Sequence, residues 1–277
     1  MFEAHTTSRG REITEGRKTA KDASLASLFG LTIGCVAGLI GVGGGEFRIP
    51  VLLHILRLSA VTAVTVNLFV GLLVVVASFF RRLQLGLLSS CYANIAFAMS
   101  VSSIVGAYVG ARLSGKLPEK TLRKFLAAFL VIIGLKIGIE PFVELPAPFT
   151  LTLDFAGETI LSVIIGLTIG IVSGYFGVAG GEFRIPALIY IFGIDVVDAG
   201  TLSLLVSIPT VSSGLLKHHR MGHFNRGAFI IAIAMGTSSV VGASIGASFV
   251  GAMDKDLLKV LLGVILVSST IRIVTKP

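Results

Sequence analysis

Two glutamates and two arginines stand in an unusual setting in this sequence. The motif GVGGGEFRIP, with Glu46 and Arg48, recurs as GVAGGEFRIP, with Glu182 and Arg184. Each copy follows a long apolar segment. An arginine beside glycines, whose backbone N–H groups stay open to a ligand, favours the binding of an anion. A glutamate two residues away either orients the arginine or takes up a proton.

The glycines and the proline of each copy predict a broken helix. Glycine tolerates backbone dihedral angles that other residues resist, and proline fits the first turn of a helix because its missing N–H costs nothing there. The helix that starts after the bend offers free N–H groups and about half a positive charge. The expected substrate-binding groups are Gly44, Gly45 and Arg48 in the first copy and Gly180, Gly181 and Arg184 in the second.

Polar residues on the apolar segment after each copy extend the candidate site. A shift that places Ile169 over Ile33 also places Ser203 over Asn67. We expect Asn67 and Ser203 to line the cavity of the site. Polar side chains in membrane helices also commonly bond to a neighbouring helix, so a structural role is the alternative.

Signatures of catalysis, of cofactors and of metals are missing from the sequence. It has no Walker lysine motif, no GxSxG and no HExxH, which are the patterns that carry the standard chemistries. The group His218, His219 and His223 has no counterpart in the other half, and a solvated basic loop explains it better than a metal site. We expect no catalytic residue, no cofactor and no metal.

The composition indicates that lipid surrounds the chain. Of its 277 residues, 54% are hydrophobic and 14% are charged, whereas a soluble domain has about 25% charged residues. Apolar runs of the length that crosses a bilayer as a helix recur along the chain, without the alternation of barrel strands. These runs are Leu25–Gly41, Ala60–Phe80, Leu87–Leu113, Thr121–Ile139, Thr159–Phe176, Ala199–Leu216, Gly227–Val250 and Leu257–Ile273. The sequence therefore predicts an all-α polytopic membrane protein.

The two halves of the chain are copies of each other. Nine of the ten motif positions are identical, and the halves align without a gap. Repeats of membrane proteins are either parallel or inverted. If the first segment of each half turns back through a short helix, from about Phe47 to Arg57 in the first half, each half makes an odd number of crossings. The second half is then inverted, and the distribution of Lys and Arg between the loops favours this arrangement over a parallel one.

Each repeat is expected to contain a broken, re-entrant first helix followed by three transmembrane helices. The expected division is a polar tail (1–24), repeat 1 (25–139), a linker (140–158) and repeat 2 (159–277). We expect the tail to be a disordered cytoplasmic extension and the linker to be extracytoplasmic. The basic loops Arg112–Lys124 and Lys217–Arg226 are then cytoplasmic, and Arg81 and Arg82 lie outside, against the positive-inside rule.

Pairs of glycines predict where helices pack closely. Gly106 with Gly110, and Gly242 with Gly246, have the spacing of small residues that lets two helices approach each other. We interpret both pairs as packing seams and assign them no role in the site.

The doubled motif resembles the TauE/SafE family of sulfite and organosulfonate exporters. The resemblance rests on GVGGGEFRIP and GVAGGEFRIP, each followed by a helix, and covers the chain from about Leu25. It implies a multi-pass transporter of the cytoplasmic (inner) membrane. It also implies a small sulfur-containing anion, such as sulfite, sulfoacetate or thiosulfate, as the substrate.

We therefore expect a secondary transporter that moves such an anion by alternating access between two inverted halves. An anion-selective channel that uses the same arginines and an intramembrane enzyme are the alternatives. The near-identity of the motif copies favours the transporter, because a shared central site needs two like halves. The expected partners are the anion and the lipid bilayer, not nucleic acid. The coupling ion, the direction of transport and the oligomeric state stay open, a homo-oligomer included.

Overall fold

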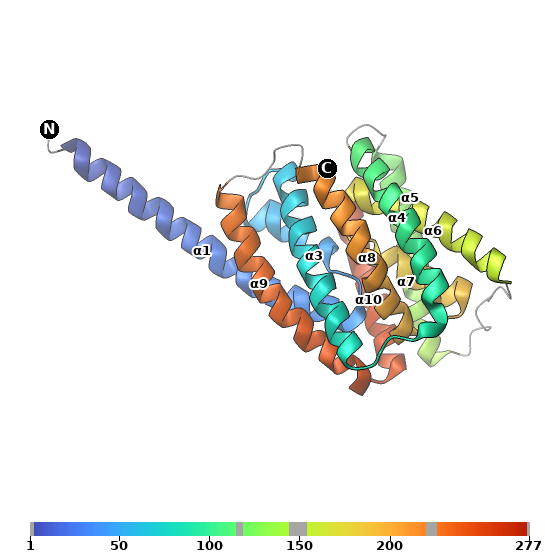
Figure 1. Cartoon of the computed structure of the whole chain (residues 1–277). Helices are drawn as coiled ribbons and strands as arrows, with labels where there is room; N and C mark the ends of the chain where they lie inside the picture. The colour runs from blue at the N-terminus through green and yellow to red at the C-terminus, as the bar shows by residue number, and fades with distance from the viewer. Residues whose placement is uncertain (1–2, 115–118, 144–153, 220–225, 276–277) are drawn as a thin grey trace.

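Helices make up all the regular structure that the computed structural model describes, which covers residues 3–114, 119–143, 154–219 and 226–275 (Figure 1). The first repeat forms α1 (Glu3–Ile40), α2 (Gly45–Pro50), the π-helix η1 (Val51–Ile55), α3 (Ala60–Gln84), the 3-10 helix η2 (Ser90–Tyr92), α4 (Ala93–Leu113) and α5 (Glu119–Ile139). The 3-10 helix η3 (Glu140–Phe142) follows. The second repeat forms α6 (Phe155–Phe176), α7 (Gly181–Phe192), α8 (Val196–His219), α9 (Arg226–Phe249), the 3-10 helix η4 (Val250–Ala252) and α10 (Lys255–Thr275). The expected all-α class is confirmed.

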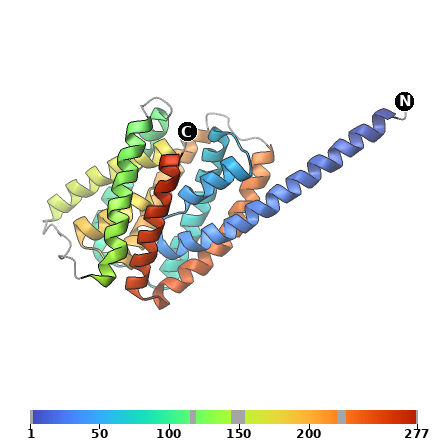
Figure 2. The same ribbon diagram turned by 180° about the vertical axis from the view of Figure 1, so that it is seen from behind.

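Several of these helices are long and apolar enough to cross a bilayer. Within the described residues there are 6 such segments: Lys21–Ile40, Ala60–Gln84, Ser90–Leu113, Phe155–Phe176, Val196–Lys217 and Ala228–Ala252. The protein is thus a multi-pass membrane protein. The two further runs expected from the sequence form α5 and α10, which pack side by side on one flank of the molecule (Figure 2).

The polar tail is helical rather than disordered. α1 begins at Glu3 and projects away from the other helices before it enters them (Figures 1 and 2). The expectation of disorder is wrong because the tail contains several Ala, Glu, Lys and Arg residues, which have high helix propensity. A helix that the apolar span has already nucleated extends through such residues at little cost.

The helices of the two repeats are interleaved. α1 of the first repeat packs along α9 of the second, and α4 of the first packs along α6 of the second. Both contacts run through the predicted glycine seams. A side chain at Gly110 would meet the backbone of Ile171 on α6, and one at Gly246 would meet the backbone of Cys35 on α1. The interpretation of these glycines as packing positions is confirmed.

Equivalent helices of the two repeats run in opposite directions. α3 and α8 occupy the same place in their repeats, yet Arg82 at the end of α3 bonds to Thr201 near the start of α8. Leu68, in the first half of α3, lies instead beside Gly214 near the end of α8. This antiparallel course is compatible with the inverted arrangement, because parallel repeats would place both helices in the same direction.

The first helix of each repeat is broken at the glycines. After α1 the chain turns back along α3. Gly43 lies beside Val75, and Gly45 lies beside Asn67, which is closer than Val75 to the start of α3. Leu52 then packs in one cluster with Ala63, still nearer to that start. α2 and η1 therefore lead the chain back toward the side from which α3 departs, as expected of a re-entrant segment.

We predict that the glycine seams tolerate no side chain. Gly110→Val and Gly246→Val each force the packed helices apart, with an expected loss of about 1–3 kcal/mol of stability from overpacking. The measurement is thermal unfolding of the purified protein in detergent. Gly251→Val is the control, because only Leu87 lies near that position, at 3.9 Å from an added Cβ. A seam variant that melts at the temperature of the control would contradict the packing role.

Candidate functional site

The two glycine bends meet each other in the centre of the protein. A Cβ added at Gly43 would lie 2.7 Å from the Cβ of Ala179, and one added at Gly181 would lie 2.5 Å from the carbonyl oxygen of Val42. Gly44 and Gly180 cap the helices that follow, with φ of 71° and 77°. These are left-handed conformations that favour glycine. The bends thus pack closely against each other, and there is no room for a side chain at Gly43 or at Gly181.

Arg48 is held from two sides. Its side chain is fully buried, its Nε donates to Oδ1 of Asn67 at 3.0 Å and its Nη2 donates to the carbonyl of Gly43 at 2.6 Å. Asn67 and the nearby Gly71 belong to the middle turns of α3. The guanidinium group therefore lies at mid-depth of a membrane-spanning helix. Its Nη1 has no hydrogen-bond partner among the described residues.

Arg184 is held differently at the equivalent place. It too is fully buried, and its Nη1 donates to the carbonyl of Ser203 at 3.1 Å and to Oγ of Ser207 at 2.7 Å. Both serines belong to the central part of α8. In the part of the chain that the structure describes, Nε and Nη2 have no hydrogen-bond partner. The second arginine therefore keeps more of its donors open than the first.

Asn67 and Ser203 do not perform the same task, although the repeat aligns them. Asn67 accepts from Arg48 and also donates through Nδ2 to the carbonyl of Gly177 at 2.7 Å, which links repeat 1 to the bend of repeat 2. Ser203 contributes its backbone carbonyl, and its hydroxyl has no partner. The side chain that holds Arg184 belongs to Ser207, a polar residue of the same segment that was not among the expected substrate-binding residues. The sequence did contain a sign of this role, because repeat 2 has a serine, Ser207, where repeat 1 has Gly71.

Glu46 and Glu182 lie close to each other. Both side chains are buried, and the carboxyl group of Glu182 lies close enough to that of Glu46 for the two groups to interact. Two carboxylates that share a site cannot both carry a full charge at low cost. The structure thus brings the two repeats together at a pair of carboxyl groups as well as at the bends.

A further buried arginine lies outside the repeated motif. Arg82 has 1% of its surface exposed, so it does not flank the membrane in water as an arginine at a helix end usually does. Sequence reasoning missed its burial. The neighbouring Arg81, which is partly exposed, gave no sign that the two side chains differ.

The open donors of the two arginines are of the kind that a small anion satisfies. Two guanidinium groups lie near the meeting point of the repeats, each with at least one donor that no atom of the described residues satisfies. A buried cation with open donors is costly unless an anion or an acceptor completes it. Arginine matches the oxygens of an oxyanion well because its N–H groups form a planar fork.

The chain also matches known proteins over most of its length. The family model described as "Sulfite exporter TauE/SafE" matches residues 4–137 and 156–277. The chain belongs to the TauE/SafE family. Its relative in Bacillus subtilis (strain 168), the "Probable membrane transporter protein YunE", is 24% identical over 262 residues, which cover 87% of this chain and 93% of that protein. No solved structure matches the chain. Membership of a family of membrane transporters supports a transporter role for this TauE/SafE protein.

We predict that Asn67 is needed for stability and that the aligned Ser203 is not. Asn67→Ala leaves Nε of Arg48 and the carbonyl of Gly177 without partners, and each buried orphan costs about 1–3 kcal/mol. Ser203→Ala removes a hydroxyl that has no partner, so its effect should stay within about 0.5 kcal/mol. Thermal unfolding of both variants in detergent measures the difference. Equal melting temperatures would show that the bonds of Asn67 contribute nothing.

Proposed function

We propose that the protein is a secondary transporter of the cytoplasmic membrane that moves a small anion by alternating access. The anion is a sulfur-containing oxyanion or an organosulfonate, of the type of sulfite, thiosulfate or sulfoacetate. The observation that carries this proposal is the pair of buried arginines, Arg48 and Arg184, whose open N–H groups lie where the two repeats meet.

The open donors support an oxyanion as the substrate. Nη1 of Arg48 and Nε and Nη2 of Arg184 are buried without partners, and an oxyanion offers several acceptor oxygens on one centre. Hydrogen bonds to charged groups contribute about 1.5–3 kcal/mol each. The name of the family model, a sulfite exporter, supports sulfur as the centre of the anion.

The contact between the bends supports alternating access over a permanent pore. Gly43 lies against the Cβ of Ala179, and Gly181 lies against the backbone of Val42. An anion passes this point only if the two repeats move relative to each other. Equivalent helices that run in opposite directions, such as α3 and α8, allow one movement of the repeats to open the path first to one side of the membrane and then to the other.

The carboxyl pair of Glu46 and Glu182 supports coupling to protons. A proton shared by two facing carboxyl groups is released when they separate and one of them meets water. The same relative movement of the repeats that frees the anion separates this pair. Proton transfer and anion transfer are thereby linked in one step.

We predict that each motif arginine contributes to substrate affinity. Arg48→Gln and Arg184→Gln each remove hydrogen bonds of a charged donor and should raise the apparent Kd about 10–100-fold. The measurement is the uptake of labelled sulfite, thiosulfate and sulfoacetate into proteoliposomes at a series of substrate concentrations. Arg57→Gln is the control, because Arg57 is exposed.

The same assay separates a transporter from a channel. A transporter gives saturable flux driven by an ion gradient, whereas a channel gives flux that does not saturate. Wild-type vesicles that pass none of these anions, or affinities left unchanged by both motif variants, would contradict the anion site.

We predict that the carboxyl pair carries the coupling proton. Glu46→Gln and Glu182→Gln each remove a titratable group from the pair and should abolish the acceleration of uptake by a pH gradient. Exchange of labelled for unlabelled anion without a gradient should persist, because the arginines are unchanged. The readout is uptake with and without an imposed pH gradient. Wild-type uptake that ignores the gradient would rule out proton coupling.

A further inference from the structure

Arg82 fastens the two repeats together at one end of their interface. Its Nη2 donates to the carbonyls of Gly38 and Leu39 at 3.1 and 2.8 Å, and these residues end α1. Its Nη1 donates to the carbonyl of Val197 at 3.3 Å and to Oγ1 of Thr201 at 3.2 Å, at the start of α8. Arg82 itself lies in the last turn of α3. It therefore joins two elements of repeat 1 to one of repeat 2.

The charge of Arg82 has no carboxylate partner among the described residues. Its four acceptors are carbonyls and a hydroxyl, whereas Arg48 and Arg184 each interact with the glutamate of their own motif. The last carbonyls of α1 carry the negative end of the helix dipole, which offsets part of the charge. Nε of Arg82 is buried without any partner. One donor and much of the positive charge are left for another ligand.

A small cavity lies beside Arg82. Its lining is apolar apart from the guanidinium group and consists of Arg82, Leu39, Ile40, Val196, Val197, Val250 and Leu258. The central space of about 10 Å³ holds about one water molecule. The cavity is bounded by the ends of α1 and α3, the starts of α8 and α10, and η4. A lone cation in an apolar cavity attracts small anions strongly because little water screens it.

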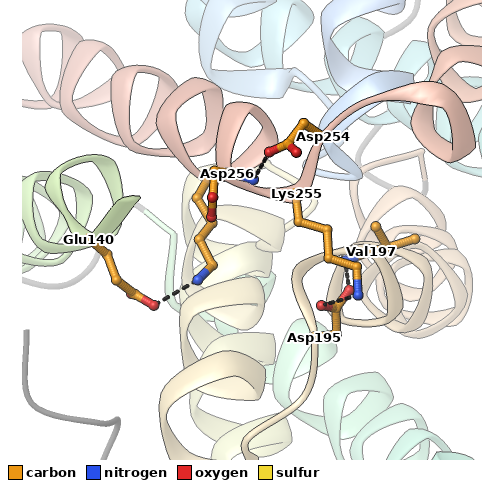
Figure 3. A network of polar contacts seen from close by, with 7 residues as sticks. Glu140, Asp195, Val197, Asp254, Lys255 and Asp256 are labelled. Atoms are coloured by element: carbon orange, nitrogen blue, oxygen red, sulfur yellow. Dashed lines mark hydrogen bonds and ion pairs between the residues drawn. The ribbon is translucent and has the colours of Figure 1, made fainter. Parts of the chain in front are cut away.

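An exposed ion pair links the start of α10 to the residue that precedes α8. Lys255 at the start of α10 pairs with Asp195 at 3.0 Å, and Asp195 also accepts from the backbone N–H of Val197 (Figure 3). The side chains of this pair are 65% and 34% exposed, so water screens them and they contribute little to stability. Lys259 pairs with Glu140 further along α10. The exposed pair at the start of α10 therefore offers little resistance to a movement of the start of α8 that widens the cavity, so that the bonds of Arg82 to Val197 and Thr201 are the polar contacts that such a movement must release.

We propose that Arg82 is a second anion-binding station at this end of the repeat interface, which the transported oxyanion occupies on its way to or from Arg48 and Arg184. This inference rests on the proposed function for the identity of the anion. The alignment of the repeats places His218 at the position of Arg82, so this arginine is not repeated in the second half.

The experiment measures the electrostatic preference of the cavity without any transport. Val197→Cys places a thiol in the cavity wall, in a background with Cys35→Ala and Cys91→Ala. The anionic 2-sulfonatoethyl methanethiosulfonate and the cationic 2-(trimethylammonium)ethyl methanethiosulfonate compete for this thiol in proteoliposomes. Because an unpaired cation concentrates anions, the ratio of anionic to cationic rates should fall about tenfold or more in Arg82→Gln. Arg81→Gln, the matched loss of a neighbouring charge, should change it less than about twofold.

Sodium sulfate tests the station in the protein that keeps Arg82. Sulfate should slow the anionic reagent in a saturable manner, compared with sodium chloride at equal ionic strength. This measurement stays informative if Arg82→Gln fails to fold. Arg82→Lys, which keeps the charge, should keep most of the preference.

The outcomes separate this inference from the proposed function. Arg48→Gln leaves the cavity intact and should retain the full preference. A preference that depends on Arg82 would support the station even if no sulfur oxyanion is transported. A preference that survives Arg82→Gln, an equal loss in Arg81→Gln, or no saturable effect of sulfate would overturn it. A lower melting temperature of Arg82→Gln with an unchanged ratio would show that Arg82 only fastens helices.

Discussion

Backbone that leaves the helix inside a membrane must find its hydrogen-bond partners within the protein, because lipid supplies none. In this chain the bend of repeat 2 obtains part of that supply from repeat 1. Asn67 of repeat 1 satisfies the carbonyl of Gly177 in repeat 2, and the bends contact each other at Gly43 and Gly181. The bend of repeat 2 is therefore incomplete without repeat 1. The close contact between the bends also explains why Gly43 and Gly181 have no side chain there.

The sequence predicted the break and the pairing of the repeats because both depend on local composition. Glycines before a proline break a helix wherever they stand, and near-identity of the two motifs implies equivalent surroundings. The choice of hydrogen-bond partners escaped prediction. Asn67 and Ser203 align in the sequence. The amide of Asn67 is long enough to accept from the arginine of its own repeat and to donate to the bend of the other repeat, whereas the shorter hydroxyl of Ser203 does neither. Ser207 takes over because it stands one turn further along α8, beside Arg184.

Arg82 and the tail show where local composition misleads. Arg81 and Arg82 form one basic pair at the end of an apolar run, and nothing in that run separates them. Their difference arises from α1 and α8, whose carbonyls surround Arg82 alone. The polarity of the tail led to the expectation of disorder. Its residues have high helix propensity and continue a membrane helix, so the tail is helical instead.

The interleaved packing also has a consequence for biosynthesis. The hydroxyl of Ser239 on α9 bonds to the carbonyl of Gly30 on α1, 209 residues away in sequence. At about 5–20 residues per second, a ribosome needs roughly 10–40 s to make the partner of α1 after α1 itself has emerged. During this time the glycine face of α1, which later fits against α9 at Gly34 and Gly38, stays without its partner in the bilayer. The insertion machinery or lipid must shield it until the second repeat arrives, and a chain that stops after the first repeat never buries it.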